Sequence, residues 1–428
     1  MVIVGDMPLS KRIGQVLFCF FVFVLPWQTR WILTPEKSEF FGFSIYLSEI
    51  FLWLALAFWL ANTDLRRIKT PIIFLVFYIF SFLSILWSED RVVAFRIWLY
   101  VFDGLMVYIF LRKHEDLRQG AVKIFLFSLF ASAIFGIWQF FALGSPAFKW
   151  LGLSGRGAWN LGDIVVENGG RFLRAYGSFP HPNIFGGYLA TGILLLIAVL
   201  PLRRSENKIS PFRRRGVSAR GGCALGAGGD LIIFFLAGIL FLALFLTFSR
   251  SAWLAFAIAL VYLAIKNSAA RKFFIYFLFL AVALSVIFWP LIKTRATSSG
   301  RLEAKSNVER MASWKDGLAV WLKNPIFGTG AGNSTKSLQL TAYSLQPKQP
   351  PHNIFILILS ELGIFGFLIY LFIWKKMWQN PAVRPLLILF FIIGFFDHYL
   401  WTLYSGQALF WAGIAFLRQD DKLPSKGG

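Results

Sequence analysis

One histidine stands directly before a long apolar run near the C-terminal end of the chain. His352 and Asn353 open this run, and Gly363 and Gly366 follow within it. On a helix with about 3.6 residues per turn, positions 352, 363 and 366 return to nearly the same face, so the spacing predicts that these residues form one stripe. Small residues on that stripe would let a neighbouring helix approach closely beneath the imidazole. Near pH 7 a neutral imidazole can serve as a general base, so the stretch has the features of a catalytic site.

Three arginines between apolar runs could supply positive charge to the same site. Arg174 lies in the stretch that ends at Asn183, Arg250 stands at a tight turn, and Arg310 lies in the long segment that His352 closes. The guanidinium group of arginine stays charged and can bind two phosphate oxygens at once. Arg250 also precedes a predicted helix start, where free N–H groups and the helix dipole favour an anion. The four residues together predict an anion site with an adjacent base.

Each of these residues also has a purely structural interpretation. Arg174 and Arg310 could be solvated loop charges, Arg250 could extend to lipid headgroups, and His352 could cap a helix. His181, which stands between two prolines, is more typical of a residue that shapes a turn.

Signals for metals, cofactors and disulfides are weaker. The stretch Gly328-Thr-Gly-Ala-Gly-Asn333 resembles a phosphate-cradling loop, but it lacks the Lys-Ser/Thr pair of nucleotide-binding loops. No paired aspartates and no His/carboxylate cluster stand out on the predicted outer face, so we expect metal-independent chemistry and no cofactor. Cys19 lies in an apolar run and Cys223 in a Gly-rich loop, so we expect no disulfide between them.

Composition indicates a protein that crosses a membrane many times. Of the 428 residues, 57% are hydrophobic, 18% aromatic and only 15% charged, with a mean hydropathy of +0.64. These values exclude an ordinary soluble protein and predict an all-α polytopic membrane protein. The net charge of +22 comes from Lys and Arg in the loops, which is typical of topology signals and of attraction to anionic lipids rather than of a nucleic-acid partner.

Twelve apolar runs have about the length that a bilayer requires. They are residues 14–29, 43–61, 71–87, 94–111, 121–143, 183–202, 231–248, 251–266, 273–292, 353–374, 386–400 and 403–418. We therefore expect a single integral membrane domain, 1–428, with about 12 transmembrane helices and an uncleaved first helix. Most Lys and Arg lie in loops on the side of the N-terminus, so we expect both termini in the cytoplasm.

This topology places three long segments. Residues 144–182 and 293–352 become extracytoplasmic loops, the second between helices 9 and 10, and residues 203–230 become a basic, Gly-rich cytoplasmic linker. Charged residues between Glu303 and Asp316 have the spacing of a short amphipathic helix within the second loop. Arg174, Arg250, Arg310 and His352 all fall at the extracytoplasmic boundary.

Several of these stretches together resemble one protein family. They are His352-Asn353 with Gly363 and Gly366, the stretch from Arg174 to Asn183, Ser249-Arg-Ser-Ala-Trp253, Asn324-Pro-Ile-Phe-Gly-Thr-Gly-Ala-Gly-Asn333, and Asp397-His-Tyr-Leu-Trp-Thr-Leu403. The combination is similar to the O-antigen ligase and polymerase family of bacterial membrane glycosyltransferases, over most of the chain. Twelve spans with a large outer loop before the tenth also suit that family.

The resemblance implies an activity. Family members take a glycan from undecaprenyl diphosphate on the outer face of the bacterial inner membrane; ligases pass it to a lipid A–core sugar, polymerases to another lipid-linked repeat, and related enzymes to protein. By resemblance, His352 would activate the acceptor hydroxyl, and Arg250 and Arg310 would neutralise the departing diphosphate. Substrate-binding residues would be Arg174, Asn183, Asn353, Gly363 and Gly366.

Two other classes of function remain open from the sequence. A transporter or lipid-linked glycan flippase would show related halves, interrupted helices and charges near the bilayer midplane, whereas this chain collects its Arg and His residues at one boundary. A structural scaffold would not explain His352 and the glycines that follow it. Within the transferase class, ligase is the leading hypothesis and polymerase the alternative.

Overall fold

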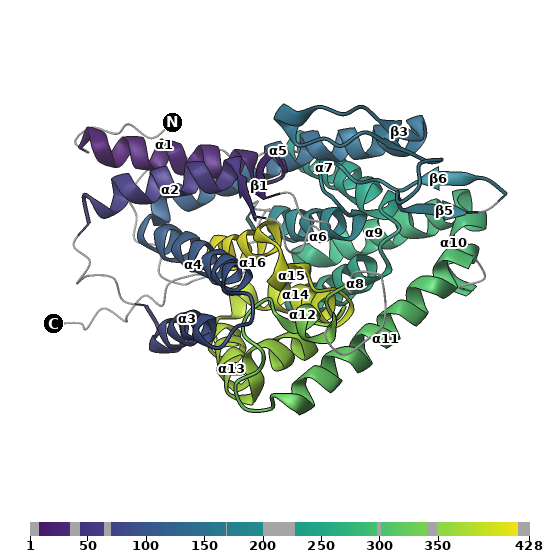
Figure 1. The fold of residues 1–428 in the computed structure, drawn as a ribbon. Coiled ribbons are helices and arrows are strands. Elements are labelled where there is room, and N and C mark those ends of the chain that lie inside the picture. Colours follow the sequence, from purple (N-terminus) through teal and green to yellow (C-terminus); the bar gives the residue numbers. More distant parts are fainter. Residues whose placement is uncertain are drawn as a thin grey trace, which may run out of the picture.

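The computed structural model describes residues 8–34, 43–63, 70–167, 169–199, 227–297, 301–339 and 349–417, and these residues are mostly helical (Figure 1). The α-helices are α1 (Leu9–Val24), α2 (Leu47–Leu60), α3 (Ile72–Leu83), α4 (Arg91–Lys113), α5 (Glu115–Ala142), α6 (Pro182–Val199), α7 (Ala227–Leu246), α8 (Arg250–Lys266), α9 (Ser268–Ile287), α10 (Trp289–Thr297), α11 (Arg301–Lys323), α12 (Ser334–Gln339), α13 (Ile354–Trp378), α14 (Arg384–Phe396), α15 (Tyr399–Thr402) and α16 (Tyr404–Leu417).

Every predicted span overlaps one of these helices, because long apolar runs leave the backbone no partner but itself in a bilayer. Four described helices, α4, α5, α9 and α13, are long and apolar enough to cross a membrane by length and composition. Shorter apolar helices accompany them. The count of twelve crossings, the cytoplasmic termini and the sides of the long loops stay predictions, and most of the predicted 203–230 linker lies outside the described residues.

Three short antiparallel ribbons correct the expectation of a purely helical fold. They pair β1 (Arg30–Thr34) with β2 (Phe43–Tyr46), β3 (Gly144–Ser145) with β4 (Arg156–Gly157), and β5 (Val165–Glu167) with β6 (Arg171–Leu173). Two of the ribbons lie in the 144–182 segment, which the sequence predicts to be an extracytoplasmic loop. Strands of two to five residues carry too little alternation of apolar and polar residues to be recognised.

The helices surround a large core that is rich in aromatic side chains. The pairs α1 with α2, α4 with α16, and α8 with α14 make extensive contacts. Between α4 and α16 the approach is so close that a Cβ on Gly104 would lie 2.0 Å from Cδ1 of Trp411. The core therefore depends on small residues opposite large rings, as expected where helices pack without water between them.

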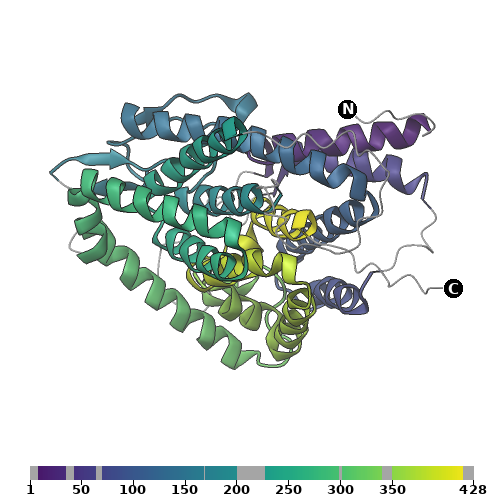
Figure 2. The ribbon, with the colours of Figure 1, turned by 180° about the vertical axis from the view of Figure 1, so that it is seen from behind.

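Helix α11 runs diagonally along one flank, from α10 to the end of the molecule where α13 lies (Figures 1 and 2). Its inner face packs on the start of α13, where a Cβ on Gly317 would lie 2.7 Å from both Pro351 and Ile356. Val308 and Met311 point outward and are exposed. A helix is therefore present over the predicted stretch from Glu303 to Asp316, and with 23 residues it is longer than expected.

Helix α13 is interrupted near its middle. Gly363 has φ 65° and ψ −170°, so one helical half ends there and another begins. The preceding segment of the chain, from Asn324 to Asn333, fills the break. Four backbone hydrogen bonds join it to the two broken ends: Thr329 N to Ser360 O (3.0 Å), Gly330 N to Glu361 O (2.8 Å), Ile364 N to Pro325 O (2.9 Å) and Phe365 N to Ile326 O (3.5 Å).

The carboxylate of Glu361 fixes the same segment through its side chain. It accepts hydrogen bonds from Gly332 N (2.7 Å), Ser334 Oγ (2.9 Å) and Trp401 Nε1 (2.7 Å). Glu361 is 1% exposed, so these donors take the place of water around a buried acid. The Gly328–Gly332 stretch therefore caps a broken helix, and its resemblance to a phosphate loop reflects glycines that are needed for this insertion.

The predicted stripe of His352, Gly363 and Gly366 is wrong. His352 precedes the first helical residue, and the helix changes direction at Gly363, so the spacing of a continuous helix does not apply. Gly363 faces the inserted segment instead of a neighbouring helix, because its Cβ would lie 2.2 Å from Ile326 O. A Cβ on Gly366 would meet Leu362 and Phe80.

Candidate active site

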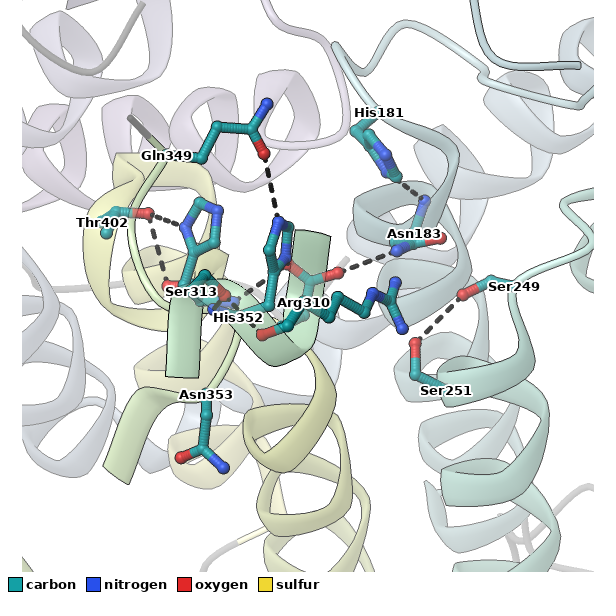
Figure 3. A network of polar contacts seen from close by, with 12 residues as sticks. His181, Asn183, Ser249, Ser251, Arg310, Ser313, Gln349, His352, Asn353 and Thr402 are labelled. Carbon is teal, nitrogen blue, oxygen red and sulfur yellow. Dashed lines mark hydrogen bonds and ion pairs between the residues drawn. The ribbon is translucent and has the colours of Figure 1, made fainter. Parts of the chain in front are cut away.

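His352 lies where α11 meets the start of α13 (Figure 3). Its backbone N–H donates to Ser313 Oγ (3.3 Å), and its carbonyl accepts from Trp314 Nε1 (3.1 Å), so α11 holds the histidine backbone. The Nε2 atom lies 3.2 Å from Gln349 Oε1. The Nδ1 atom is buried and has no hydrogen-bond partner among the described residues. Nε2 is thus held beside a polar side chain, whereas Nδ1 is buried without a hydrogen bond to the described residues.

Asp397 and His398 stand beside this imidazole. They follow α14, where the extended backbone of Asp397 ends the helix. Asp397 Oδ1 lies 4.0 Å from His352 Nδ1 and accepts from the His398 N–H (2.9 Å), while Oδ2 accepts from Asn183 Nδ2 (2.9 Å). The ring centroids of His398 and His352 are 4.9 Å apart, and His398 Nδ1 lies 2.8 Å from Thr402 Oγ1. The fold thus brings two imidazoles and a carboxylate into one group.

Burial and charge set the protonation of this group. Burial lowers the pKa of His352 below its usual value, while the Asp397 carboxylate opposes that shift. Burial likewise lowers the pKa of His398 to about 3. For Asp397 burial acts upward, but the surrounding basic groups, His352 first, outweigh it and lower the pKa to about 2. At neutral pH the group therefore consists of neutral imidazoles beside an ionised carboxylate.

Arg310 reaches the site from α11. Its side chain extends from the helix toward the start of α8, where the hydroxyls of Ser249 and Ser251 lie 3.3 Å apart (Figure 3). Within the described ranges the guanidinium makes no hydrogen bond or ion pair, and its Nε is buried. Arg310 as a whole is half-buried, and a partly desolvated charge without a partner in the described chain is costly, so this guanidinium is suited to bind an anion from outside the chain.

Arg250 opens α8, as the sequence predicts, and Ser249 caps that helix by accepting from Ala252 N (3.4 Å). Its guanidinium donates to Arg295 O (3.2 Å) and Asn307 Oδ1 (3.1 Å). Arg250 therefore ties the start of α8 to α10 and α11, and in this way holds the helix that carries Arg310 close to the site.

Arg174 and Asn183 lie beneath the site. Arg174 is 3% exposed and donates from Nε to Thr247 O (2.5 Å) and from Nη2 to Asn183 Oδ1 (2.9 Å). Because Asn183 in turn donates to Asp397, a continuous chain of hydrogen bonds runs from Arg174 to the carboxylate. The sequence predicts both residues to bind substrate at the membrane boundary; the structure places them in the interior, where they support Asp397.

His181 is part of the same group of residues. Its Nδ1 accepts from the Asn183 N–H (3.0 Å), so it does stabilise the turn before α6. The His181 side chain is half-buried, and the residues that surround it still desolvate the ring. Burial lowers the pKa of His181 to about 3, with the Asp397 charge opposing and the Arg174 charge adding to the shift. We refer to His181, Arg310, His352, Asp397 and His398 as the polar cluster.

Three other predicted site residues serve the fold. Asn353 points away from the polar cluster (Figure 3) and caps α13 by accepting from Phe355 N (3.0 Å) and Ile356 N (3.1 Å). Gly363 and Gly366 lie further along α13, where they allow the insertion and close packing described above. Their expected roles in substrate binding stay predictions, since their described contacts are with the protein itself.

Three members of the polar cluster could share a metal ion. His352, Asp397 and His398 each offer one ligand atom, and these atoms lie within 4.8 Å of one another. Two imidazoles and a carboxylate are a donor set that Zn²⁺ accepts. The expectation that this face has no His/carboxylate cluster is therefore wrong, because the fold joins residues that are distant in the sequence. Both Asp397 oxygens already accept hydrogen bonds, so the same groups are also arranged to orient a base.

Some site residues that the sequence analysis does not predict still carry a recognisable sequence signal. Asp397 and His398 form an acidic-basic dipeptide between two apolar runs, where such residues are costly without partners. Ser313 and Gln349, which contact His352, carry no such signal.

A cavity elsewhere does not coincide with the polar cluster. It has a volume of about 460 Å³ and lies beside the inserted segment of α13. Its lining residues are Trp87, Glu89, Asn324, Phe327, Gly328 and Thr329. None of these residues belongs to the polar cluster. We therefore place the candidate active site at the polar cluster and not at this cavity.

The comparison with known protein families gives one result. Residues 235–371 match the model of a family described as O-antigen ligase. The matched segment contains Arg250, Arg310 and His352, whereas His181 and Asp397 lie outside it. No curated protein sequence matches the chain. The resemblance to the O-antigen ligase family is thus confirmed over residues 235–371, which include the motifs at Ser249–Trp253, Asn324–Asn333 and His352–Gly366.

Proposed function

We propose that this protein transfers a glycan from undecaprenyl diphosphate to a hydroxyl group of a lipid A–core sugar, as an O-antigen ligase. The family match supports the class of a membrane glycosyltransferase. The donor, the acceptor and the roles of individual residues are inferred from the polar cluster and from the resemblance of the motifs.

The observation that carries this proposal is the Arg310 guanidinium beside His352. Arg310 has no ion pair or hydrogen bond within the described part of the chain, and its charge acts directly on His352. An unpaired cation next to a neutral base suits a reaction in which a hydroxyl loses a proton while negative charge develops nearby. Diphosphate departure from a sugar is such a reaction.

The proposed step balances as follows. His352 takes the proton from the acceptor hydroxyl, and the oxygen attacks the anomeric carbon of the lipid-linked sugar. The bond from that carbon to the diphosphate oxygen breaks, and undecaprenyl diphosphate leaves with the bonding electrons. Arg310 stabilises the developing charge, with Arg250 at the start of α8 as a second cation. No step is assigned to a metal ion.

Asp397 and its support orient the base. The carboxylate faces Nδ1 of His352, so it favours the tautomer with the proton on Nδ1 and leaves Nε2 to accept from the hydroxyl. Because Gln349 Oε1 can only accept a hydrogen bond, the acceptor hydroxyl has to replace Gln349 at Nε2 for this tautomer to act as a base. Arg174 and Asn183 hold the carboxylate in place through their hydrogen bonds. We assign Arg174 and Asn183 to positioning and not to direct contact with substrate.

The interrupted helix α13 does not favour a transporter. In transporters the free backbone groups of a broken helix bind the substrate or ion. Here the Thr329 and Gly330 N–H groups and the Pro325 and Ile326 carbonyls of the same chain satisfy them. The break is thus a joint between α13 and the segment before it.

The membrane setting follows from the same proposal. The protein would span the bacterial inner membrane several times, with the polar cluster facing the periplasm. Its partners would be the lipid-linked glycan, the acceptor glycolipid and membrane lipids.

A complementation experiment tests the function. The chromosomal gene is deleted and replaced by wild type, His352→Ala, Arg310→Ala or Lys305→Ala, and the surface glycan is resolved on a gel. Lys305 is an exposed residue of the same helix as Arg310, so Lys305→Ala is the matched control. We expect wild type and Lys305→Ala to restore the glycan, and the other two variants to lose about 10²–10⁴-fold in transfer. Normal transfer by a stable His352→Ala protein would refute the proposal.

The deletion strain separates ligase from polymerase. Accumulation of undecaprenyl-linked polymer of normal length without transferred product supports a ligase. Accumulation of single repeat units identifies a polymerase of the same family.

A further inference from the structure

His181 has an open hydrogen-bond donor. Because its Nδ1 accepts from the Asn183 N–H, the proton of the neutral ring must lie on Nε2. Within the described residues Nε2–H has no hydrogen-bond partner. The turn therefore uses one side of the imidazole and leaves the other side available.

The surroundings of this donor favour an anion. The charged and titratable groups that act on His181 are Asp397, Arg174, His352 and Arg310. Asp397 is the one acid among them, and its oxygens are already bonded to Asn183 and to the His398 backbone. Arg310 brings a guanidinium without a partner to the same place. An anion with several oxygens that pairs with Arg310 can therefore present another oxygen to His181.

We propose that His181 binds substrate by donating its Nε2–H to a phosphate oxygen of the lipid-linked diphosphate that pairs with Arg310. The inference rests on the proposed function for the identity of the anion. His181 approaches from the start of α6 and Arg310 from α11, so the two residues hold the diphosphate from different elements (Figure 3).

His181 acts in this role as a neutral donor. Burial keeps its pKa far below neutrality, so it adds direction but no charge to the site. One hydrogen bond to a charged group is expected to change the dissociation constant about 10- to 100-fold. Arg310, which contributes charge, should have a larger effect.

Two substitutions distinguish binding from turn formation. In His181→Asn, the side-chain oxygen can accept from the N–H two residues on, as in an Asx turn, so the turn is kept and the Nε2 donor is lost. In His181→Gln, the amide nitrogen reaches near the position of Nε2, so a donor is kept and the turn acceptor is lost. Thermal unfolding of each purified variant checks the fold.

The measurement is the dissociation constant of undecaprenyl diphosphate for the detergent-purified full chain. We expect His181→Asn to melt like wild type and to bind about 10- to 100-fold more weakly, and His181→Gln to bind more tightly than His181→Asn. Unchanged binding by His181→Asn would overturn the inference and leave His181 as a turn residue. Misfolding of both variants would overturn it too, since His181 would then belong to the fold.

A failure of this inference can be told from a failure of the proposed function. If His352→Ala transfers glycan normally, the proposed function is refuted, whatever His181 does. If His352→Ala abolishes transfer while His181→Asn binds undecaprenyl diphosphate as wild type does, only the role of His181 is refuted.

Discussion

His352 and Asp397 face each other at 4.0 Å, slightly beyond hydrogen-bond distance. The Nδ1 of His352 has no partner in the described structure, so a small rotation of the ring would bring it onto the carboxylate. Such contacts are often long in enzymes without bound substrate and shorten when it binds. In that arrangement Nε2 is directed at the position now taken by Gln349, where an acceptor hydroxyl would have to lie.

Replacing Asp397 by Asn should change both the rate and its pH dependence. The Asp397 charge raises the pKa of His352, whereas burial lowers it below 6.5. Without that charge the His352 pKa falls further, so the acidic limb of kcat/KM should move to lower pH. We expect kcat/KM near pH 7 to drop about 100-fold because the imidazole loses its orienting partner. A pH profile of the purified enzyme decides: loss of activity without displacement of the acidic limb would contradict a direct effect on His352.

At the scale of single residues, sequence reasoning identified the cationic and basic groups that converge on one place. His352 and Arg310 were expected in the site because their types fit phosphate chemistry, and the structure brings them together. It could not show that Arg174 is buried beneath the site, since an arginine in a loop looks the same whether it binds substrate or a backbone carbonyl. It also could not join Asp397 to His352, because contacts over such a separation depend on how α13 and α14 pack.

The inserted segment of α13 links elements that are distant in the sequence. It bonds to both broken ends of the helix, and Glu361 joins it to Trp401 of α15. Helix α15 begins directly after His398. The same joint therefore connects the middle of α13 to the helix that follows Asp397 and His398, so a disturbance of this joint should reach the polar cluster.

Gly363→Ala should destabilise the protein. The φ of 65° is unfavourable for a side chain, and the added Cβ would lie 2.2 Å from Ile326 O, which is backbone and has no room to move. The cost is expected to be at least about 1–3 kcal/mol. Gly120→Ala in α5 is the matched control, because no atom lies within 4 Å of its added Cβ. Thermal unfolding in detergent compares the two, and an equal melting temperature for both variants would show that the break does not require glycine.

At the scale of elements, the sequence predicted where helices lie because apolar runs of membrane length form them. It did not predict the interruption of α13, since glycines are common in membrane helices and no proline marks the break. The glycines at 328, 330 and 332 resemble a phosphate loop in sequence, although the Lys-Ser/Thr pair of such loops is absent. Their positive φ values are required by the insertion, which only the packed structure reveals.

At the scale of the whole molecule, two helices that begin at the polar cluster carry basic residues at their far ends. Helices α8 and α13 both begin at the polar cluster, at Arg250 and just after His352. Both end in basic residues, Lys266 in α8 and Lys375 and Lys376 in α13. Basic residues gather on the cytoplasmic side of membrane proteins, so the distribution favours a polar cluster on the opposite, periplasmic side.

Cysteine labelling tests this orientation. Single cysteines replace exposed lysines, as Lys149→Cys in the segment before α6 or Lys376→Cys at the end of α13, in a chain from which Cys19 and Cys223 have been removed. A membrane-impermeant maleimide applied to spheroplasts should label Lys149→Cys, and should label Lys376→Cys only after the membrane is permeabilised. The physical reason is that the Lys376 side lies with the basic helix ends, which the positive-inside rule retains in the cytoplasm. The reverse pattern would place His352 and Arg310 in the cytoplasm, where a glycan exposed at the outer face could not reach them, and the proposed transfer reaction would have to be abandoned.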